Sequence, residues 1–140
     1  MPVTCKDTTA LVGRMLLAAL FLLSGIAKLN DPSSTIAYID SSGMPFPTLA
    51  YLAALGVELG LAALLVLGIQ TRLVAVIIAV FTVVTGAIFH SSLADPEQFD
   101  NFFKNISIAG GLLQVAAFGG GMLSIDALLA RRRTFALLNG

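Results

Sequence analysis

Long apolar stretches separated by short polar segments are the main pattern along this chain. A helix needs roughly 17–25 mainly apolar residues to cross a bilayer core of about 30 Å, and four stretches meet that condition. They cover residues 11–27, 49–69, 73–89 and 103–118. The last one ends at residue 118, because the three glycines that follow would each cost about 1 kcal/mol inside a helix. The pattern predicts a single membrane domain over residues 1–140, an all-α integral membrane four-helix bundle.

The polar segments between these stretches carry residues that begin and end helices. Gly68 followed by Thr71 is typical of a helix end and a new N-cap, so the second and third spans should form a tight hairpin. Asp31 before Pro32 predicts another helix start. The residues that follow, 32–42, carry scattered apolar side chains, and we expect them to form a short interfacial helix on the membrane surface.

Basic residues are divided unevenly between the two predicted sides of the membrane. Four spans put both termini on one side, together with the turn between the second and third spans. That side holds six of the eight basic residues: Lys6, Arg14, Arg72 and residues 131–133. The other two are Lys28 and Lys104. Because basic residues near span ends mark the cytoplasmic side, we expect the N- and C-termini to be cytoplasmic.

Composition supports a membrane location and narrows the function classes. Hydrophobic residues make up 57% of the chain and charged residues 11%, whereas soluble domains are about 25% charged. A soluble domain of this length could not bury so much apolar surface in its core. A formal net charge of zero excludes a basic nucleic-acid-binding surface. One alternative stays open at the N-terminus: residues 15–23 followed by Gly25-Ile26-Ala27 also fit a cleaved signal peptide.

Ionisable residues at membrane depth are the first candidates for chemistry. Glu58 lies near the middle of the second span, roughly 13 Å below the outer surface at 1.5 Å per helical residue. A carboxylate at that depth must be protonated, paired or facing a cavity. The axial distance between Glu58 and Arg14 of the first span is about 8 Å, so these two long side chains are expected to pair. The alternatives are a purely structural link between helices for Glu58 and snorkelling to the cytoplasmic surface for Arg14.

A second group of polar residues is expected around this buried carboxylate. Lys28, His90 and Asn105 belong to the outer level of the bundle and predict a polar mouth above it. Gln114 and Thr85 lie deeper, on the fourth and third spans, and add polar groups to the bundle centre. Each of these residues also has a simpler interpretation, as a link between helices or as an interfacial side chain.

The glycines, the histidine and the cysteine bear on helix packing and on which metal, haem and disulfide sites the chain can form. Gly56 and Gly60 flank Glu58 in a G-x-x-x-G pattern, which favours close approach of another helix. His90 is the only histidine and Cys5 the only cysteine. We therefore expect no metal site, no haem held by two histidines and no disulfide within the chain.

Several short motifs lie in order between residues 10 and 130. They are Arg14, Ser24-Gly25-x-x-Lys28-Leu29, Gly43-Met44-Pro45, Tyr51, Glu58 with Gly60, Gly68-x-x-Thr71-Arg72, His90, Lys104-Asn105 to Gly110-Gly111, and Ser124-x-Asp126. Together these motifs resemble the DoxX family of small four-helix membrane proteins. The resemblance implies a location in the bacterial inner membrane and an association with oxidoreductase systems, such as a quinone-linked thiosulfate oxidase, a superoxide dismutase or a sulfurtransferase.

These observations lead to one main functional hypothesis and two alternatives. The main one is a redox-associated inner-membrane protein, a subunit of a quinone-linked oxidoreductase that binds quinone or a similar molecule within the bundle. Glu58 and Arg14 are the expected catalytic residues. Glu58 would exchange a proton with the bound molecule, and Arg14 would tune the charge of Glu58. The expected binding residues are His90, Lys28, Asn105, Gln114 and Thr85.

The alternatives belong to other classes of protein. The first is a non-enzymatic membrane anchor or assembly partner for soluble redox enzymes, with contacts from residues 131–133 or 32–42. The second is a small transporter, which would need a homo-oligomer because four helices do not enclose a pore and no broken-helix pair is visible.

Overall fold

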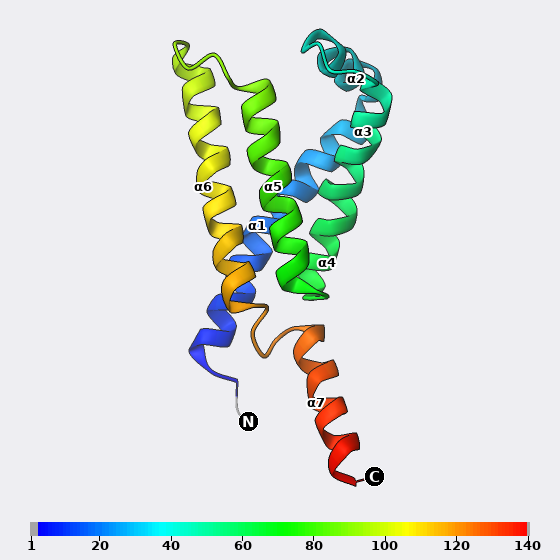
Figure 1. Cartoon of the computed structure of the whole chain (residues 1–140), viewed down its shortest axis with the longest axis vertical. Helices are drawn as coiled ribbons and strands as arrows, with labels where there is room; N and C mark the ends of the chain where they lie inside the picture. Colours follow the sequence, from blue (N-terminus) through cyan, green and yellow to red (C-terminus); the bar gives the residue numbers. More distant parts are fainter. Residues whose placement is uncertain (1–2, 140) are drawn as a thin grey trace.

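A computed structural model describes residues 3–139 and shows helices joined by short loops, with no strand in this range (Figure 1). The helices are α1 (Cys5–Asn30), α2 (Pro32–Ser41), α3 (Pro47–Leu55), the π-helical segment η1 (Gly56–Leu61), α4 (Ala62–Leu67), α5 (Thr71–Phe89), α6 (Pro96–Phe118) and α7 (Ile125–Asn139). α3, η1 and α4 follow one another without a break and form one continuous helix. The predicted all-α class is confirmed.

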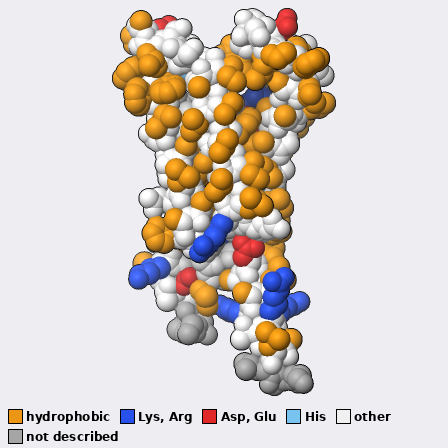
Figure 2. All heavy atoms as spheres, in the orientation of Figure 1, with side chains coloured by type: hydrophobic (Ala, Val, Ile, Leu, Met, Phe, Trp, Pro, Cys, Tyr) orange, Lys and Arg blue, Asp and Glu red, His pale blue; other side chains and the backbone are white. Residues whose placement is uncertain are grey.

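Three helices within residues 3–139 are long and apolar enough to cross a membrane: α1, the continuous helix Pro47–Leu67, and α5. Many of their large apolar side chains point outward, and Leu16, Leu23 and Val80 are 70%, 69% and 58% exposed. Figure 2 shows hydrophobic side chains over the middle of the molecule and most charged ones near its two ends. The chain is therefore an integral membrane protein whose apolar outer surface contacts the lipid bilayer.

Helix α6 lies beside α5 along most of its length (Figure 1). It begins at Pro96, earlier than the predicted stretch, because the Asp95 side chain accepts a hydrogen bond from Glu97 N and caps the helix. It ends at Phe118, as expected, where Gly119 takes a left-handed φ of 80°. Both termini lie at the same end of the molecule, which we call the terminal end; α2 lies at the opposite end, the α2 end (Figure 1). The fourth span and the cytoplasmic position of the termini stay predictions.

The turns lie where the sequence predicts that helices end and begin. Gly68 ends α4 with a φ of 70°, and α5 begins at Thr71, so the predicted hairpin is confirmed. Asp31 accepts a hydrogen bond from Ser34 N and caps α2, which ends at Ser41. α1 begins before the predicted stretch because Thr4 caps it: its backbone N–H and its hydroxyl both donate hydrogen bonds to Asp7 Oδ2.

Close helix packing depends on glycines other than those predicted. A Cβ at Gly25 would lie 2.6 Å from Leu59 Cδ2, so a larger residue there would force the Leu59 side chain or η1 to shift away from α1. A Cβ at Gly86 would lie 3.1 Å from Asn105 Cβ, between α5 and α6. Nothing lies within 4 Å of the corresponding positions at Gly56 and Gly60, so the close approach predicted from the G-x-x-x-G pattern is wrong. That pattern allows close contact only where a helix faces it. Gly56 and Gly60 are exposed, whereas α1 meets η1 at Glu58 and Leu59.

The glycine contact between α1 and η1 can be tested with a matched pair of substitutions. Gly25→Val should lower the free energy of unfolding by about 1–3 kcal/mol, because the added carbons overlap Leu59. Gly110→Val should change it by less than about 0.5 kcal/mol, because nothing lies within 4 Å of its Cβ position. Thermal unfolding in detergent measures both, and equal losses would contradict the proposed contact.

Candidate functional site

A charged pair joins α1 to η1 inside the bundle. Lys28 Nζ lies 2.9 Å from Oε1 and 2.9 Å from Oε2 of Glu58, and it also donates a 2.9 Å hydrogen bond to Ser24 Oγ. The Glu58 side chain is only 7% exposed, and that of Lys28 is 26% exposed. Glu58 therefore has the counter-charge that a carboxylate at membrane depth needs.

Local sequence explains why this pair forms. Ser24 and Lys28 are four residues apart on α1, so they share one face of the helix. Gly25 lies between them, and a Cβ there would come within 3.2 Å of Glu58 Cβ. The absence of a side chain at Gly25 thus brings the backbone of η1, with Glu58, next to α1. Tyr51 Oη adds a 3.3 Å hydrogen bond to the carbonyl oxygen of Lys28 and links α3 to the last turn of α1.

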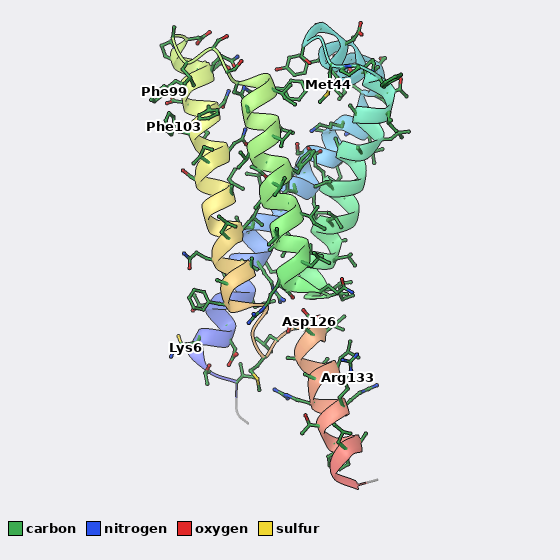
Figure 3. All side chains as sticks on the ribbon, viewed as in Figure 1. Lys6, Met44, Phe99, Phe103, Asp126 and Arg133 are labelled. Atoms are coloured by element: carbon green, nitrogen blue, oxygen red, sulfur yellow. The ribbon has the colours of Figure 1, made fainter. Side chains whose placement is uncertain are left out.

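The pair lines a cavity of about 300 Å³, to whose lining α2 also contributes residues. Its polar lining residues are Ser24, Lys28, Thr35, Glu58, Thr82, Thr85, His90 and Asn105. Its aromatic lining residues are Phe21, Tyr38, Phe81 and Phe89. Tyr38 stacks on Phe89 with ring centroids 5.5 Å apart, so α2 packs over the end of α5 beside the cavity. Met44, labelled at the α2 end in Figure 3, also lines it.

The structure brings most of the predicted site residues together. Glu58, Lys28, His90, Asn105 and Thr85 all line this cavity. His90 Nδ1 lies 2.8 Å from Gln98 Oε1, so a hydrogen bond joins His90 to the start of α6. Thr85 Oγ1 donates to the carbonyl oxygen of Thr82 at 3.0 Å. The five residues come from α1, η1, α5, the C-cap of α5 and α6, so several elements supply hydrogen-bonding groups to the cavity.

Two predicted site residues lie elsewhere. Arg14 and Gln114 line a separate groove near the terminal end, between α1 and α6. The predicted pair between Arg14 and Glu58 is wrong, because Glu58 is held by Lys28 while Arg14 Nη2 donates to the carbonyl oxygen of Leu123 at 2.9 Å. Both side chains are long enough for the predicted pair, but each turns to the nearest polar group at its own end of the bundle.

Sequence reasoning missed the aromatic wall and the serine beside the pair. Tyr38 and Phe89 are far apart in sequence, and only the folding of α2 over α5 brings them together. Ser24 had a signal, because it lies one helical turn before Lys28 in the motif that contains both.

A second polar cluster docks α7 on the hairpin at the terminal end. Asp126, near the start of α7 (Figure 3), accepts 2.8 Å hydrogen bonds from Gln70 N, Thr71 N and Thr71 Oγ1. Its own backbone N–H donates to Gly68 O at 3.0 Å. Burial alone would raise the pKa of Asp126, but the bonds from Thr71 and Gln70 and the charge of Arg14 together hold that pKa below its ordinary value. Asp126 thus caps α5 from outside the helix.

The fold and the site define a helical membrane protein that spans the bilayer several times and carries a charged pair facing a cavity between its helices. Comparison with known families makes this more specific. A DoxX family model matches residues 9–91, a range that contains Lys28, Glu58, Thr85 and His90. The chain belongs to the DoxX family, which confirms the resemblance in its motifs.

Two relatives from Escherichia coli match along most of their length. Inner membrane protein YqjF is 36% identical over 127 residues, covering 91% of this chain and 96% of the relative. Inner membrane protein YphA is 35% identical over 127 residues, covering 86% of this chain and 90% of the relative. No solved structure matches the chain.

The Lys28–Glu58 pair can be tested by a double-mutant cycle. Lys28→Met and Glu58→Gln should each lower the free energy of unfolding by about 3 kcal/mol, because each leaves one charge or polar group buried without its partner. The double variant should lose less than the sum, by more than about 1 kcal/mol, because its two changes remove one interaction. Combining Glu58→Gln with Arg14→Met is the control and should be additive. Additive losses for Lys28 and Glu58 would contradict the pairing.

The docking of α7 should depend on pH in one direction. Because folding lowers the pKa of Asp126, its stabilisation is complete above about pH 4 and disappears as the pH falls through the lowered value. Asp126→Asn should therefore lower the unfolding temperature at pH 7, by an amount equivalent to about 1 kcal/mol, and the difference should shrink below pH 4. Asp100→Asn, at an exposed position on α6, is the control and should have little effect at either pH. A difference that grows on acidification would contradict the assignment.

Proposed function

We propose that this DoxX-family protein lies in the bacterial inner membrane, with both termini cytoplasmic, and binds a small hydrophobic molecule with a polar head, of the quinone type. The observation that carries the proposal is the Lys28–Glu58 pair on a cavity that four aromatic side chains also line. The names of the two relatives support the location. The excess of basic residues at the terminal end supports the orientation.

The lining residues fit a flat ring that carries oxygen atoms. Phe21, Phe81 and Phe89 supply apolar ring faces, and Lys28, His90 and Asn105 supply polar groups on the same cavity. A volume of about 300 Å³ is at the lower end of the range for small-molecule pockets, which suits a single-ring head group. A hydrophobic tail would leave the cavity among the apolar side chains that face the lipid.

Within this proposal, the charged pair handles protons. A bound quinone supplies two-electron, two-proton redox chemistry. Lys28 pairs with Glu58 and also lines the cavity, where its ammonium can donate to an entering oxygen. As the head group is reduced or oxidised, Glu58 would pass a proton to that oxygen or accept one from it, while Lys28 would hold the oxygen by a hydrogen bond. Ser24, which accepts from Lys28, limits how far the ammonium moves.

The proposed site can be tested by binding of decylubiquinone to the purified protein in detergent. Asn105→Ala and Thr85→Val should each weaken binding about three- to tenfold, since each removes a polar group worth about 1 kcal/mol. Gln114→Ala should leave the dissociation constant unchanged, because Gln114 does not line the cavity. Equal affinities for wild type, Asn105→Ala and Thr85→Val, or a loss only in Gln114→Ala, would contradict the proposal.

A further inference from the structure

The cavity that contains the Lys28–Glu58 pair reaches the lipid-facing surface of the bundle at Leu20. This residue lines the cavity and is 48% exposed, and it belongs to the central part of α1, at the depth of the hydrocarbon core. Tyr38, also exposed on the cavity wall, belongs to α2, near the exposed carboxylate of Asp40. A hydrocarbon chain that leaves the cavity therefore has an apolar exit at Leu20 and a polar one at Tyr38.

A groove of about 720 Å³ begins one helical turn from this exit, between the first half of α1 and the last half of α6. Leu16 lines the groove and is 70% exposed. Because Leu16 and Leu20 are four residues apart, they share one face of α1, and the groove continues from the cavity along that face. Leu17 lies 3.5 Å from the Cβ position of Gly111, so α1 and α6 touch there. The path from cavity to groove therefore runs over the outer, lipid-facing side of α1.

The shape and lining of this groove suit a linear hydrocarbon chain. Its apolar walls are Leu16, Leu17, Val115 and Phe118. Gly13 leaves space in it, because nothing lies within 4 Å of the Cβ position of that residue. From Leu17 to Lys6, which lies near the start of α1 (Figure 3), the groove is about 16 Å long at 1.5 Å per helical residue. Gln114 is exposed on the groove, and its polar amide adds no attraction for an alkyl chain.

We propose that the ligand of the cavity carries a linear hydrocarbon tail, which leaves at Leu20 and lies in the α1–α6 groove with its free end toward the terminal end. This inference rests on the proposed function and adds the class of ligand: a quinone-type head with a long apolar tail. The cavity, at about 300 Å³, holds a single-ring head, so a long tail needs a second surface. Because the free tail is already surrounded by lipid, the groove attracts it by close packing.

Photolabelling of the full chain in lipid nanodiscs shows directly where the tail lies. The probe is decylubiquinone with a diazirine at the free end of its decyl tail. Irradiation should label the first half of α1 and the last half of α6, within residues 5–17 and 111–118, and excess decylubiquinone should abolish this labelling. Labelling confined to α2 and α3, or labelling that excess decylubiquinone does not reduce, would overturn the proposal.

Two glycines provide a matched pair of variants that separate the tail from the head. Gly13 lines the groove and Gly110 does not, and nothing lies within 4 Å of the Cβ position of either. Gly13→Leu should weaken binding of decylubiquinone about three- to tenfold, because its side chain fills the space of the tail. It should leave binding of the tail-free dimethoxy-methyl-benzoquinone unchanged, and Gly110→Leu should change neither.

The two quinones also distinguish failure of this inference from failure of the proposed function. If both bind the wild type and Gly13→Leu binds decylubiquinone equally well, the tail site is overturned and the head site stands. If neither quinone binds the wild type, the proposed function is overturned, and the tail site with it.

Discussion

Charged side chains at membrane depth need a partner, and the arrangement of the bundle at the Lys28–Glu58 pair follows from this constraint. Glu58 has Lys28 as counter-charge, and Lys28 has Ser24 as a further acceptor. The pair forms only because Gly25 lets η1 approach α1, and Tyr51 then links α3 to the same turn. The cavity lies beside this fixed group of helices, so its polar side has a defined geometry.

The terminal end obeys the same constraint in a different way. There the carboxylate of Asp126 is well supplied with hydrogen bonds: it accepts three and docks α7 on the start of α5. The guanidinium of Arg14 lacks some of its hydrogen bonds, because two of its buried nitrogens have no partner among the described residues. The two ends of the bundle therefore differ: the cavity is lined by a complete ion pair, whereas the buried guanidinium at the terminal end keeps unpaired donors.

Much of the fold could be predicted because it depends on local sequence. Apolar stretches, proline and glycine at helix ends, and capping residues such as Asp31 act within a few positions, and the helices follow them closely. Five of the seven predicted site residues line one cavity because all five belong to the outer halves of their predicted spans or to the ends of those halves. The partner of Glu58 could not be predicted in the same way. Arg14 and Lys28 both lie within reach by axial distance, and the choice depends on the loop carbonyl at Leu123 and on the contact at Gly25. The aromatic wall from α2 likewise requires the tertiary arrangement.

The central claim is that Glu58 is paired with Lys28 and not with Arg14. Solid-state NMR in lipid bilayers can measure it directly, through the dipolar coupling between the ¹⁵N-labelled Lys28 Nζ and the ¹³C-labelled Glu58 Cδ. The account predicts a strong coupling, as expected for an N–O contact of 2.9 Å, and none between Glu58 Cδ and the Arg14 guanidinium nitrogens. A coupling of Glu58 to Arg14 with none to Lys28 would contradict it.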